Sequence, residues 1–319
     1  MPRVTVIIPT YNRAHLIGKA IESVLKQTYS DFEIIVVDDG STDKTASQVA
    51  EYGNRICYLY QKHAGSSEAR NLALQASVGE FVAFLDSDDL WVPEKLEKQI
   101  PLFDADKSTG LVYSFTKMTD EKGNALEHET KKRLRLHREA FKRGYSYEEM
   151  TKFCVLWPST ILIRKNCFER VGFFDPRTES FEDWDLYLRL ALVGYRFVGI
   201  PEPLVLFRVH EHHRTSQEFS EGRVNTALKH LALLEKRSDL AFRDRARLNL
   251  FLQLAAVYYM LSDFSKCIHY VREALKLDPR LLFDFRTAKQ FFSAAFLGPL
   301  LNKIRQASGQ AVESVTVKV

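Results

Sequence analysis

The sequence has few cysteines and no apolar run long enough to cross a membrane. The four cysteines, Cys57, Cys154, Cys167 and Cys267, are widely separated and match no zinc-binding or redox spacing. This usage is typical of reduced thiols and predicts a cytoplasmic protein. A spanning helix needs about 18 consecutive apolar residues, which the chain lacks. The N-terminus also lacks the charged and apolar regions of a signal peptide, so we expect no signal peptide.

Glycine and net charge are low as well. No glycine-rich phosphate loop follows the first apolar run, which argues against a nucleotidyltransferase. The net charge of +4 is too small to indicate nucleic acid as a partner, and no nucleic-acid-reading motif is present. Hydrophobic residues make up 45% of the chain and charged residues 27%, which predicts a folded globular protein.

Three short apolar runs each end in polar residues. Residues 4–8 precede Pro-Thr-Tyr-Asn, residues 32–37 precede Asp-Asp-Gly-Ser, and residues 81–85 precede Asp-Ser-Asp-Asp. Segments 16–25 and 69–76, between the runs, have apolar residues at helical spacing. Strands that alternate with helices predict an α/β fold with a mostly parallel sheet flanked by helices. The polar segments should then meet at one edge of the sheet, where such folds bind ligands.

The third run ends in three crowded carboxylates, Asp86, Asp88 and Asp89. Such acids repel one another unless a cation lies among them. Mg²⁺ or Mn²⁺ needs few protein carboxylates when substrate phosphates supply the other oxygens, so one interpretation is a metal–diphosphate site. The alternative is a polar turn that caps the next helix.

Four segments, in this order and at this spacing, resemble the motifs of family 2 glycosyltransferases. They are residues 6–12 (Val-Ile-Ile-Pro-Thr-Tyr-Asn), residues 37–43 (Val-Asp-Asp-Gly-Ser-Thr-Asp), residues 69–71 (Ala-Arg-Asn) and residues 86–88 (Asp-Ser-Asp). The resemblance covers about residues 3–215. It implies the Rossmann-like GT-A fold and inverting transfer of a sugar from a nucleoside-diphosphate sugar, expected to be a UDP-sugar. It also implies Mn²⁺ or Mg²⁺ as cofactor.

The resemblance further implies that seven residues bind the donor: Pro9, Thr10, Tyr11, Asp39, Arg70, Asp86 and Ser87. Tyr11 and its two predecessors would hold the nucleoside, and Asp39 would accept a hydrogen bond from the base. Arg70 would lie near the nucleotide, and Asp88 would bind the metal with help from Asp86. The alternatives are a ring that plugs the sheet edge for Tyr11, a turn cap for Asp39 and a surface ion pair for Arg70.

Two further segments belong to the same resemblance. Asp183 matches the catalytic base of the family's Glu-Asp motif, with Glu182 as the alternative base; ordinary stabilisation of a helix start by acids would also explain both. His210 matches a histidine that approaches metal or diphosphate, and an exposed loop is an equally good interpretation. His212 and His213 match no such position, so we expect them in an exposed loop.

The rest of the chain differs in composition. Residues 131–143 carry seven Lys or Arg against one Glu, as expected of a solvated insertion or of a surface attracted to anionic lipid. We assign residues 1–217 to the catalytic domain, 218–307 to a helical, tetratricopeptide-like region with helices that meet near Ser262-Asp263, and 308–319 to a disordered tail. Segment 288–304 is aromatic and too short to span a bilayer.

The sequence as a whole predicts a glycosyltransferase of cell-surface polysaccharide biosynthesis. Its expected partners are a nucleotide-sugar donor, a glycan or lipid-linked acceptor, the inner membrane face as a peripheral contact, and a protein bound by the C-terminal helices. The alternative is a catalytically silent nucleotide-binding scaffold that uses those helices to bind a partner. The carboxylates Asp86, Asp88 and Asp183 favour the enzyme, since a scaffold has no need of all three.

Overall fold

The computed structural model describes residues 1–152, 154–210 and 216–283. The chain divides into two compact units, Met1–Gly222 and Arg223–Val319. The first is an α/β unit built on one eight-stranded sheet, and the described part of the second is helical. The predicted fold class is therefore confirmed.

The sheet combines parallel and antiparallel strands in the order β3-β2-β1-β4-β7-β6-β8-β5. Its strands are β1 (Val4–Thr10), β2 (Phe32–Asp38), β3 (Cys57–Tyr60), β4 (Phe81–Phe84), β5 (Leu90–Trp91), β6 (Thr109–Thr119), β7 (Ile161–Arg164) and β8 (Arg196–Arg208). The strands β3, β2, β1 and β4 run parallel, as do β6 and β8. The strand β7 is antiparallel to β4 and β6, and β5 is antiparallel to β8.

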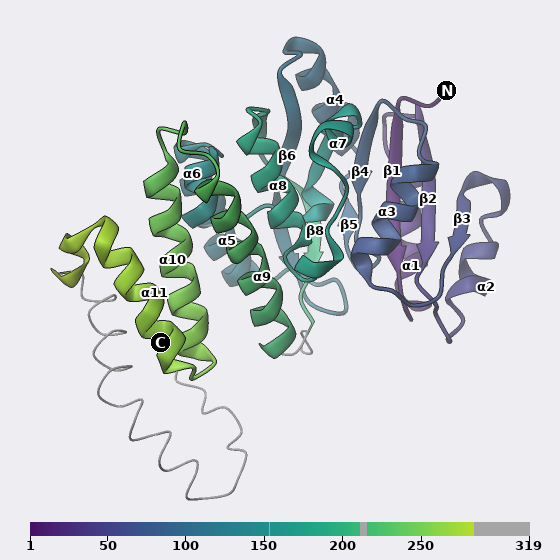
Figure 1. Ribbon diagram of the computed structural model, residues 1–319. Helices are drawn as coiled ribbons and strands as arrows, with labels where there is room; N and C mark the ends of the chain where they lie inside the picture. The colour runs from purple at the N-terminus through teal and green to yellow at the C-terminus, as the bar shows by residue number, and fades with distance from the viewer. Residues whose placement is uncertain (153, 211–215, 284–319) are drawn as a thin grey trace, which may run out of the picture. The chain divides into compact units, whose positions relative to one another are not determined.

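Helices flank the sheet and fill the connections between strands (Figure 1). Those of the first unit are α1 (Ile17–Leu25), α2 (Thr45–Ala50), α3 (Ser66–Ala76), α4 (Lys95–Ala105), α5 (Glu127–Arg143), α6 (Tyr147–Lys152), α7 (Asn166–Val171) and α8 (Glu182–Leu192), with the 3₁₀ turns η1 (Gly53–Arg55), η2 (Pro158–Thr160) and η3 (Pro176–Thr178). Within the described ranges, no helix is long and apolar enough to cross a membrane.

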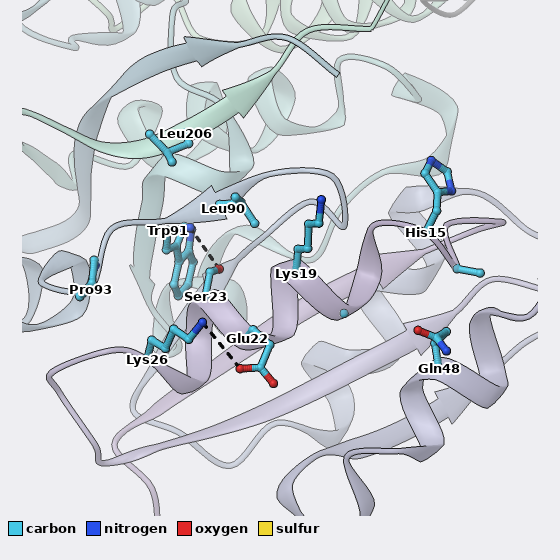
Figure 2. Close-up of a pocket in the computed structure, with 12 residues that line it drawn as sticks. His15, Lys19, Glu22, Ser23, Lys26, Gln48, Leu90, Trp91, Pro93 and Leu206 are labelled. Atoms are coloured by element: carbon cyan, nitrogen blue, oxygen red, sulfur yellow. Dashed lines mark hydrogen bonds and ion pairs between the residues drawn. The ribbon is translucent and has the colours of Figure 1, made fainter. Parts of the chain in front are cut away.

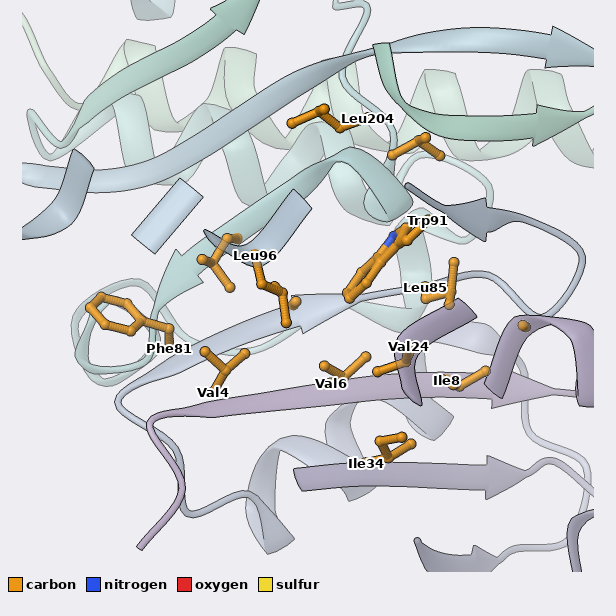
Figure 3. Close-up of a cluster of buried hydrophobic side chains, with 14 of the residues drawn as sticks. Val4, Val6, Ile8, Val24, Ile34, Phe81, Leu85, Trp91, Leu96 and Leu204 are labelled. Atoms are coloured by element: carbon orange, nitrogen blue, oxygen red, sulfur yellow. The ribbon is translucent and has the colours of Figure 1, made fainter. Parts of the chain in front are cut away.

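The core explains why the first apolar run is continuous. Val4, Val6 and Ile8 point to one face of the sheet, where they pack in a buried cluster with Val24 of α1 and Leu96 of α4 (Figure 3). Successive side chains of a strand point to opposite faces, so the residues between them point to the other face. There α3 packs against β1 and β2. A strand covered on both faces has no solvent side, and its sequence has no polar alternation.

The second unit is built on a helix pair. The helix α9 (Ser216–Glu235) crosses from the first unit into the second, and α10 (Arg243–Met260), α11 (Phe264–Leu277) and the turn η4 (Pro279–Phe283) follow. The helices α10 and α11 pack on each other. Asp263 caps α11 by accepting a hydrogen bond from the Lys266 N–H. The junction lies where the sequence places it, and the likeness to a tetratricopeptide repeat stays a prediction. The aromatic segment 288–304 and the tail lie outside the described residues.

Candidate active site

The carboxyl ends of three parallel strands form the base of the site. Thr10 at the end of β1 is level with Asp38 at the end of β2, and Ile7 of β1 is level with Phe84 of β4. The polar segments that follow β1 and β2 contact each other directly. Asn12 has a positive φ of 52°, and its side-chain oxygen accepts a hydrogen bond from the Thr42 N–H at 2.8 Å.

Asp39, the predicted partner of a nucleobase, holds the loop of residues 61–65. Its Oδ1 accepts hydrogen bonds from Gln61 Nε2 at 2.6 Å and from the Ala64 N–H at 2.8 Å. Its Oδ2 accepts one from the Gly65 N–H at 3.0 Å and lies 2.8 Å from His63 Nδ1. The protein itself therefore uses this carboxylate fully. A ligand N–H that binds here has to replace one of these donors.

Tyr11 extends from the end of β1 and is 41% exposed. Its ring stacks on the His63 ring, with 4.1 Å between centroids and 22° between the planes. Pro9 pairs with Val37 in the sheet, and Thr10 is buried. The Thr10 hydroxyl has no hydrogen-bond partner among the described residues. The predicted nucleoside loop therefore offers one exposed ring and one unused hydroxyl.

Arg70, predicted near the nucleotide, is a buried bridge between two carboxylates. Its Nη2 lies 2.9 Å from Asp86 Oδ1, and its Nη1 lies 2.6 Å from Glu182 Oε1. Its guanidinium also lies over the Phe174 ring, 5.5 Å from the centroid. The side chain is 4% exposed, which excludes the surface ion pair that we weighed as its alternative. Arg70 links the strand end that carries Asp86 to the start of α8.

The acids after β4 have three different environments. Asp86 pairs with Arg70 and is half-buried, whereas Asp88 Oδ2 lies 2.9 Å from His210 Nε2. Burial raises the pKa of the Asp86 carboxyl; the Arg70 guanidinium opposes this rise and the Asp88 charge adds to it. Asp89 is buried, and burial with two like charges raises its pKa well above the ordinary value. Ser87, between the acids, is also buried.

These side chains fit a divalent cation only in company with a ligand. In the described part of the chain, no group of three or more His, Cys, Asp or Glu is arranged to hold a metal ion. Asp88 and His210 face each other with about a fifth of each side chain exposed, and the side chain of Asp86, two residues before Asp88, is 30% exposed. Two or three such ligands suffice for Mg²⁺ or Mn²⁺ when a diphosphate supplies the remaining oxygens. His210 thus lies beside Asp88, while His212 and His213 lie outside the described residues.

Asp183 and Glu182 occupy the first turn of α8. Glu182 is buried. It forms an ion pair with Arg70 and accepts a hydrogen bond from the Ser66 hydroxyl at 3.0 Å. Asp183 accepts only the N–H of Trp184, at 2.7 Å, and has no ion pair among the described residues. Burial, and after it the Glu182 charge, raises the pKa of Asp183 to about 7. A carboxylate with this pKa is suited to take a proton near neutral pH.

The loop before α8 is fixed by contacts of its own. Ser180 has a positive φ of 75°, a conformation that costs energy in a residue with a side chain. The preceding Glu179 accepts hydrogen bonds from the hydroxyls of Ser66 and Ser67, both at 2.7 Å, at the start of α3. The Glu179 carboxylate thus lies at the N-terminus of α3, where the helix dipole favours a negative charge. The strained residue is thus held between α3 and α8, immediately before the two acids.

Comparison with known proteins identifies the family. The family model for glycosyl transferase family 2 matches residues 5–172. An uncharacterized glycosyltransferase of Rickettsia typhi is 31% identical over 269 residues, which cover 83% of this chain and 79% of the relative. The chain belongs to glycosyl transferase family 2.

A narrower stretch matches an Escherichia coli enzyme, the UDP-Glc:alpha-D-GlcNAc-diphosphoundecaprenol beta-1,3-glucosyltransferase WfgD. Identity is 48% over 101 residues, 31% of this glycosyltransferase and 40% of the relative. Among solved structures, S. aureus TarS 1-349 in complex with UDP superposes with a TM-score of 0.67 at 20% identity, covering 99% of this chain and 94% of that one. A mannosyltransferase of Pyrobaculum calidifontis with GDP-Man and Mn²⁺ gives 0.54 at 20% identity, over 97% and 88%. These likenesses show the fold.

Several residues of the site escaped the sequence motifs. His63 contacts both Tyr11 and Asp39, and only its place in the segment before Ala69-Arg70-Asn71 hinted at a role. Ser159 is fully buried and accepts the Asp86 N–H at 3.1 Å, although 73 residues separate the two. A serine between Pro158 and Thr160 gives no sequence signal for such a contact.

The structure also has a groove of about 570 Å³ along α1 and β5 (Figure 2). Apolar side chains such as Leu90 and Trp91 line it together with His15 and the charged Lys19 and Lys26. Its lining contains none of the predicted site residues, so we do not assign the groove to the donor.

Proposed function

We propose that this glycosyltransferase transfers a sugar, with inversion, from a UDP-sugar to a hydroxyl group of a glycan or lipid-linked acceptor in cell-surface polysaccharide synthesis. The observation that carries the proposal is the bridge from Asp86 through Arg70 to Glu182. This bridge ties the strand end with the Asp-x-Asp motif to the helix start that holds Asp183. The donor and acceptor halves of the reaction therefore have a common, fixed frame. The UDP-dependent E. coli relative and the UDP complex of TarS support the choice of nucleotide.

Different residues of the chain bind the donor, hold the metal and accept the proton. Tyr11 offers a ring to the base, and Asp88 with His210 would hold Mn²⁺ or Mg²⁺ next to the diphosphate, with Asp86 assisting. The cation, when bound, neutralises charge that develops on the leaving diphosphate. Asp183 takes the proton of the acceptor hydroxyl as its oxygen attacks the anomeric carbon. A bond forms from this oxygen to the carbon while the bond to the diphosphate breaks on the opposite face.

Asp183 is preferred over Glu182 as the base because, among the described residues, Asp183 has no ion pair whereas Glu182 pairs with Arg70. Glu182 neutralises the buried Arg70 guanidinium. If Glu182 were also the base, it would be protonated in every catalytic cycle, and the ion pair with Arg70 would be lost each time. The raised pKa of Asp183 supports the same choice. We keep Glu182 as a positioning residue.

A donor screen tests the function. Purified protein is incubated with UDP-, GDP-, CDP- and dTDP-sugars and Mn²⁺, and release of the nucleoside diphosphate is measured. We expect release from a UDP-sugar, loss of the activity in excess chelator, and loss in Asp88→Asn. Full activity in chelator would contradict the metal role. Binding of UDP without turnover of any donor, with or without glycan and undecaprenyl-linked acceptors, would favour the silent scaffold.

A further inference from the structure

The His63 side chain occupies the position that the proposed function gives to the nucleobase. Its ring stacks on Tyr11 at 4.1 Å, and its Nδ1 lies 2.8 Å from Asp39 Oδ2. A flat ring on Tyr11 and a ring N–H directed at Asp39 are the two contacts expected of the base. In the structure, one side chain of the protein makes both.

The backbone holds His63 at this position. Gly40 has a φ of +83°, and a Cβ at this position would lie 2.7 Å from the backbone nitrogen of His63. Only glycine therefore lets the two backbone segments approach so closely. On the far side of His63, the N–H groups of Ala64 and Gly65 donate to Asp39. The main chain is thus fixed on both sides of the residue.

The His63 side chain is free to move although its backbone is fixed. It is 56% exposed. A rotation about its side-chain bonds would uncover the Tyr11 ring and release one acceptor of Asp39, and would leave the hydrogen bonds of the loop intact. Such rotations of exposed side chains take picoseconds to nanoseconds.

We propose that His63 is a built-in competitor of the donor nucleobase, which covers Tyr11 and Asp39 in the donor-free enzyme and moves aside when the donor binds. The inference rests on the proposed function, which gives the Tyr11 ring to the base, and on the hydrogen bond from the base to Asp39 that the family resemblance implies. The competition lowers donor affinity by the fraction of time that the position is open. It also refills the position when the product leaves, which disfavours rebinding of the nucleoside diphosphate.

The same geometry defines the class of base that displaces His63. A base has to replace a ring N–H donated to a carboxylate as well as a stacked ring. Uracil, thymine and guanine have a ring N–H at the pairing edge, whereas cytosine and adenine have a bare ring nitrogen there. A carboxylate repels a bare nitrogen lone pair. We therefore expect UDP to displace His63 more readily than CDP, although both bases are pyrimidines of the same size.

Calorimetric titration with UDP and Mn²⁺ tests the competitor. His63→Ala should bind UDP about 2- to 10-fold more tightly than wild type, the change that corresponds to one lost aromatic pair. His63→Phe keeps the stack and removes the N–H, so its affinity should lie between the two. The control is His128→Ala, which changes an exposed histidine of α5 and should leave the affinity as in wild type.

The outcomes are separable. Unchanged or weaker UDP binding in a folded His63→Ala, as judged by circular dichroism, would overturn the inference and make His63 a wall of the base site. CDP binding as tight as UDP binding would overturn the assigned class of base. A wild type that binds none of UDP, GDP, CDP and ADP would instead refute the proposed function. A crystal structure with UDP should show the base on Tyr11 and His63 rotated away; a base bound elsewhere with His63 still stacked would contradict us.

Discussion

Two adjacent carboxylates at the start of α8 have opposite surroundings. Glu182 is neutralised by the buried Arg70 guanidinium, and Asp183 has no cation of its own among the described residues. Proteins assign acid and base roles by such differences between neighbouring carboxyl groups. The pKa of Asp183 is raised to about 7 because burial and the Glu182 charge both disfavour its ionised form.

The base role predicts a specific kinetic result for Asp183→Asn. We expect kcat to fall at least about a hundredfold, the lower range of general-base contributions. The Kd for UDP should change little, because the lost interaction matters in the transition state. In wild type, kcat/KM should fall as the pH drops below about 7, since the protonated carboxyl cannot accept the proton. Near-wild-type turnover in the variant would transfer the role to Glu182.

The same pKa has a consequence for stability. The pKa of the Asp183 carboxyl is raised from 3.8 to about 7 in the folded protein, so the folded state binds the carboxyl proton more tightly than the unfolded chain does. The resulting stabilisation is present below about pH 4 and is lost as the pH rises through 7. Asp183→Asn should therefore unfold at a higher temperature than wild type at pH 8, with little difference at pH 4. Glu182→Gln, which leaves Arg70 with one partner fewer, should unfold at a lower temperature.

The sequence predicts the chemistry of these residues better than their partners. The acids after the third apolar run indicated Asp86 and Asp88, because strand ends meet at one edge of a parallel sheet, whereas Asp183 was indicated only by the resemblance to the family's Glu-Asp motif. The pairing of Arg70 with Glu182 was beyond sequence reasoning, since 112 residues separate them and neither pattern refers to the other. The sequence likewise contained no sign that donors of residues 61–65 occupy the Asp39 carboxylate, because these donors also lie far from Asp39 in the chain.

At the scale of elements, the first half of the sheet follows from periodicity and the second half does not. The apolar runs became β1, β2 and β4, and the helical spacings became α1 and α3. The long strands β6 and β8 pair with several register shifts, and β7 inserts antiparallel between β4 and β6. Non-local pairing of this kind leaves no local period in the sequence.

Two elements jointly hold the loop of the Asp-x-Asp motif. The Ser159 hydroxyl of η2 accepts the Asp86 N–H and donates to Asp89 Oδ2 at 2.6 Å. Asp89 Oδ1 accepts the Arg208 N–H at the end of β8, at 3.0 Å. The Arg208 side chain returns to the carbonyl of Asp88 at 2.9 Å. Ser159 and Asp89 thus set the backbone on which the proposed metal ligand stands.

Ser159→Ala should therefore impair the use of metal more than the fold. Partners of metal ligands typically contribute 10- to 100-fold to affinity or activity. We expect the Mn²⁺ concentration for half-maximal activity to rise by about tenfold or more. The control is Ser77→Ala, another buried serine that bonds the Leu74 carbonyl, away from the loop. A lower melting temperature in both variants with an unchanged Mn²⁺ requirement would reduce Ser159 to a structural residue.

At the scale of the whole molecule, the distribution of charge matters more than the net charge of +4. The basic run 131–143 lies entirely in α5, which packs on β6 and β8. The seven cations do not share one environment. Arg133 turns inward: its guanidinium lies 3.4 Å from the Trp157 ring centroid and donates to the Val155 carbonyl. The other cations of the run are exposed, so α5 presents a basic outer face.

This face predicts salt-dependent binding to anionic membranes, where lipid-linked acceptors are found. Lys131, Arg135, Arg138 and Lys142 follow one another at helical spacing and are all exposed. Each cation near an anionic surface contributes about 1 kcal/mol, and the attraction is screened over about 8 Å at physiological salt. Wild type should co-sediment with phosphatidylglycerol vesicles at low salt and separate from them at high salt. The variant with all four residues changed to Ser should stay in solution.

A second variant separates position from total charge. Changing the exposed Lys19, Lys26, Arg55 and Lys107 to Ser also removes four positive charges and leaves α5 intact. If the basic face of α5 binds the membrane, this variant should sediment like wild type, because the screened attraction acts only where cations approach the lipid. Equal losses in both variants would mean that net charge alone drives adsorption. Sedimentation that ignores salt and both sets of substitutions would exclude an electrostatic contact, and α5 would then be a solvated helix beside the active site.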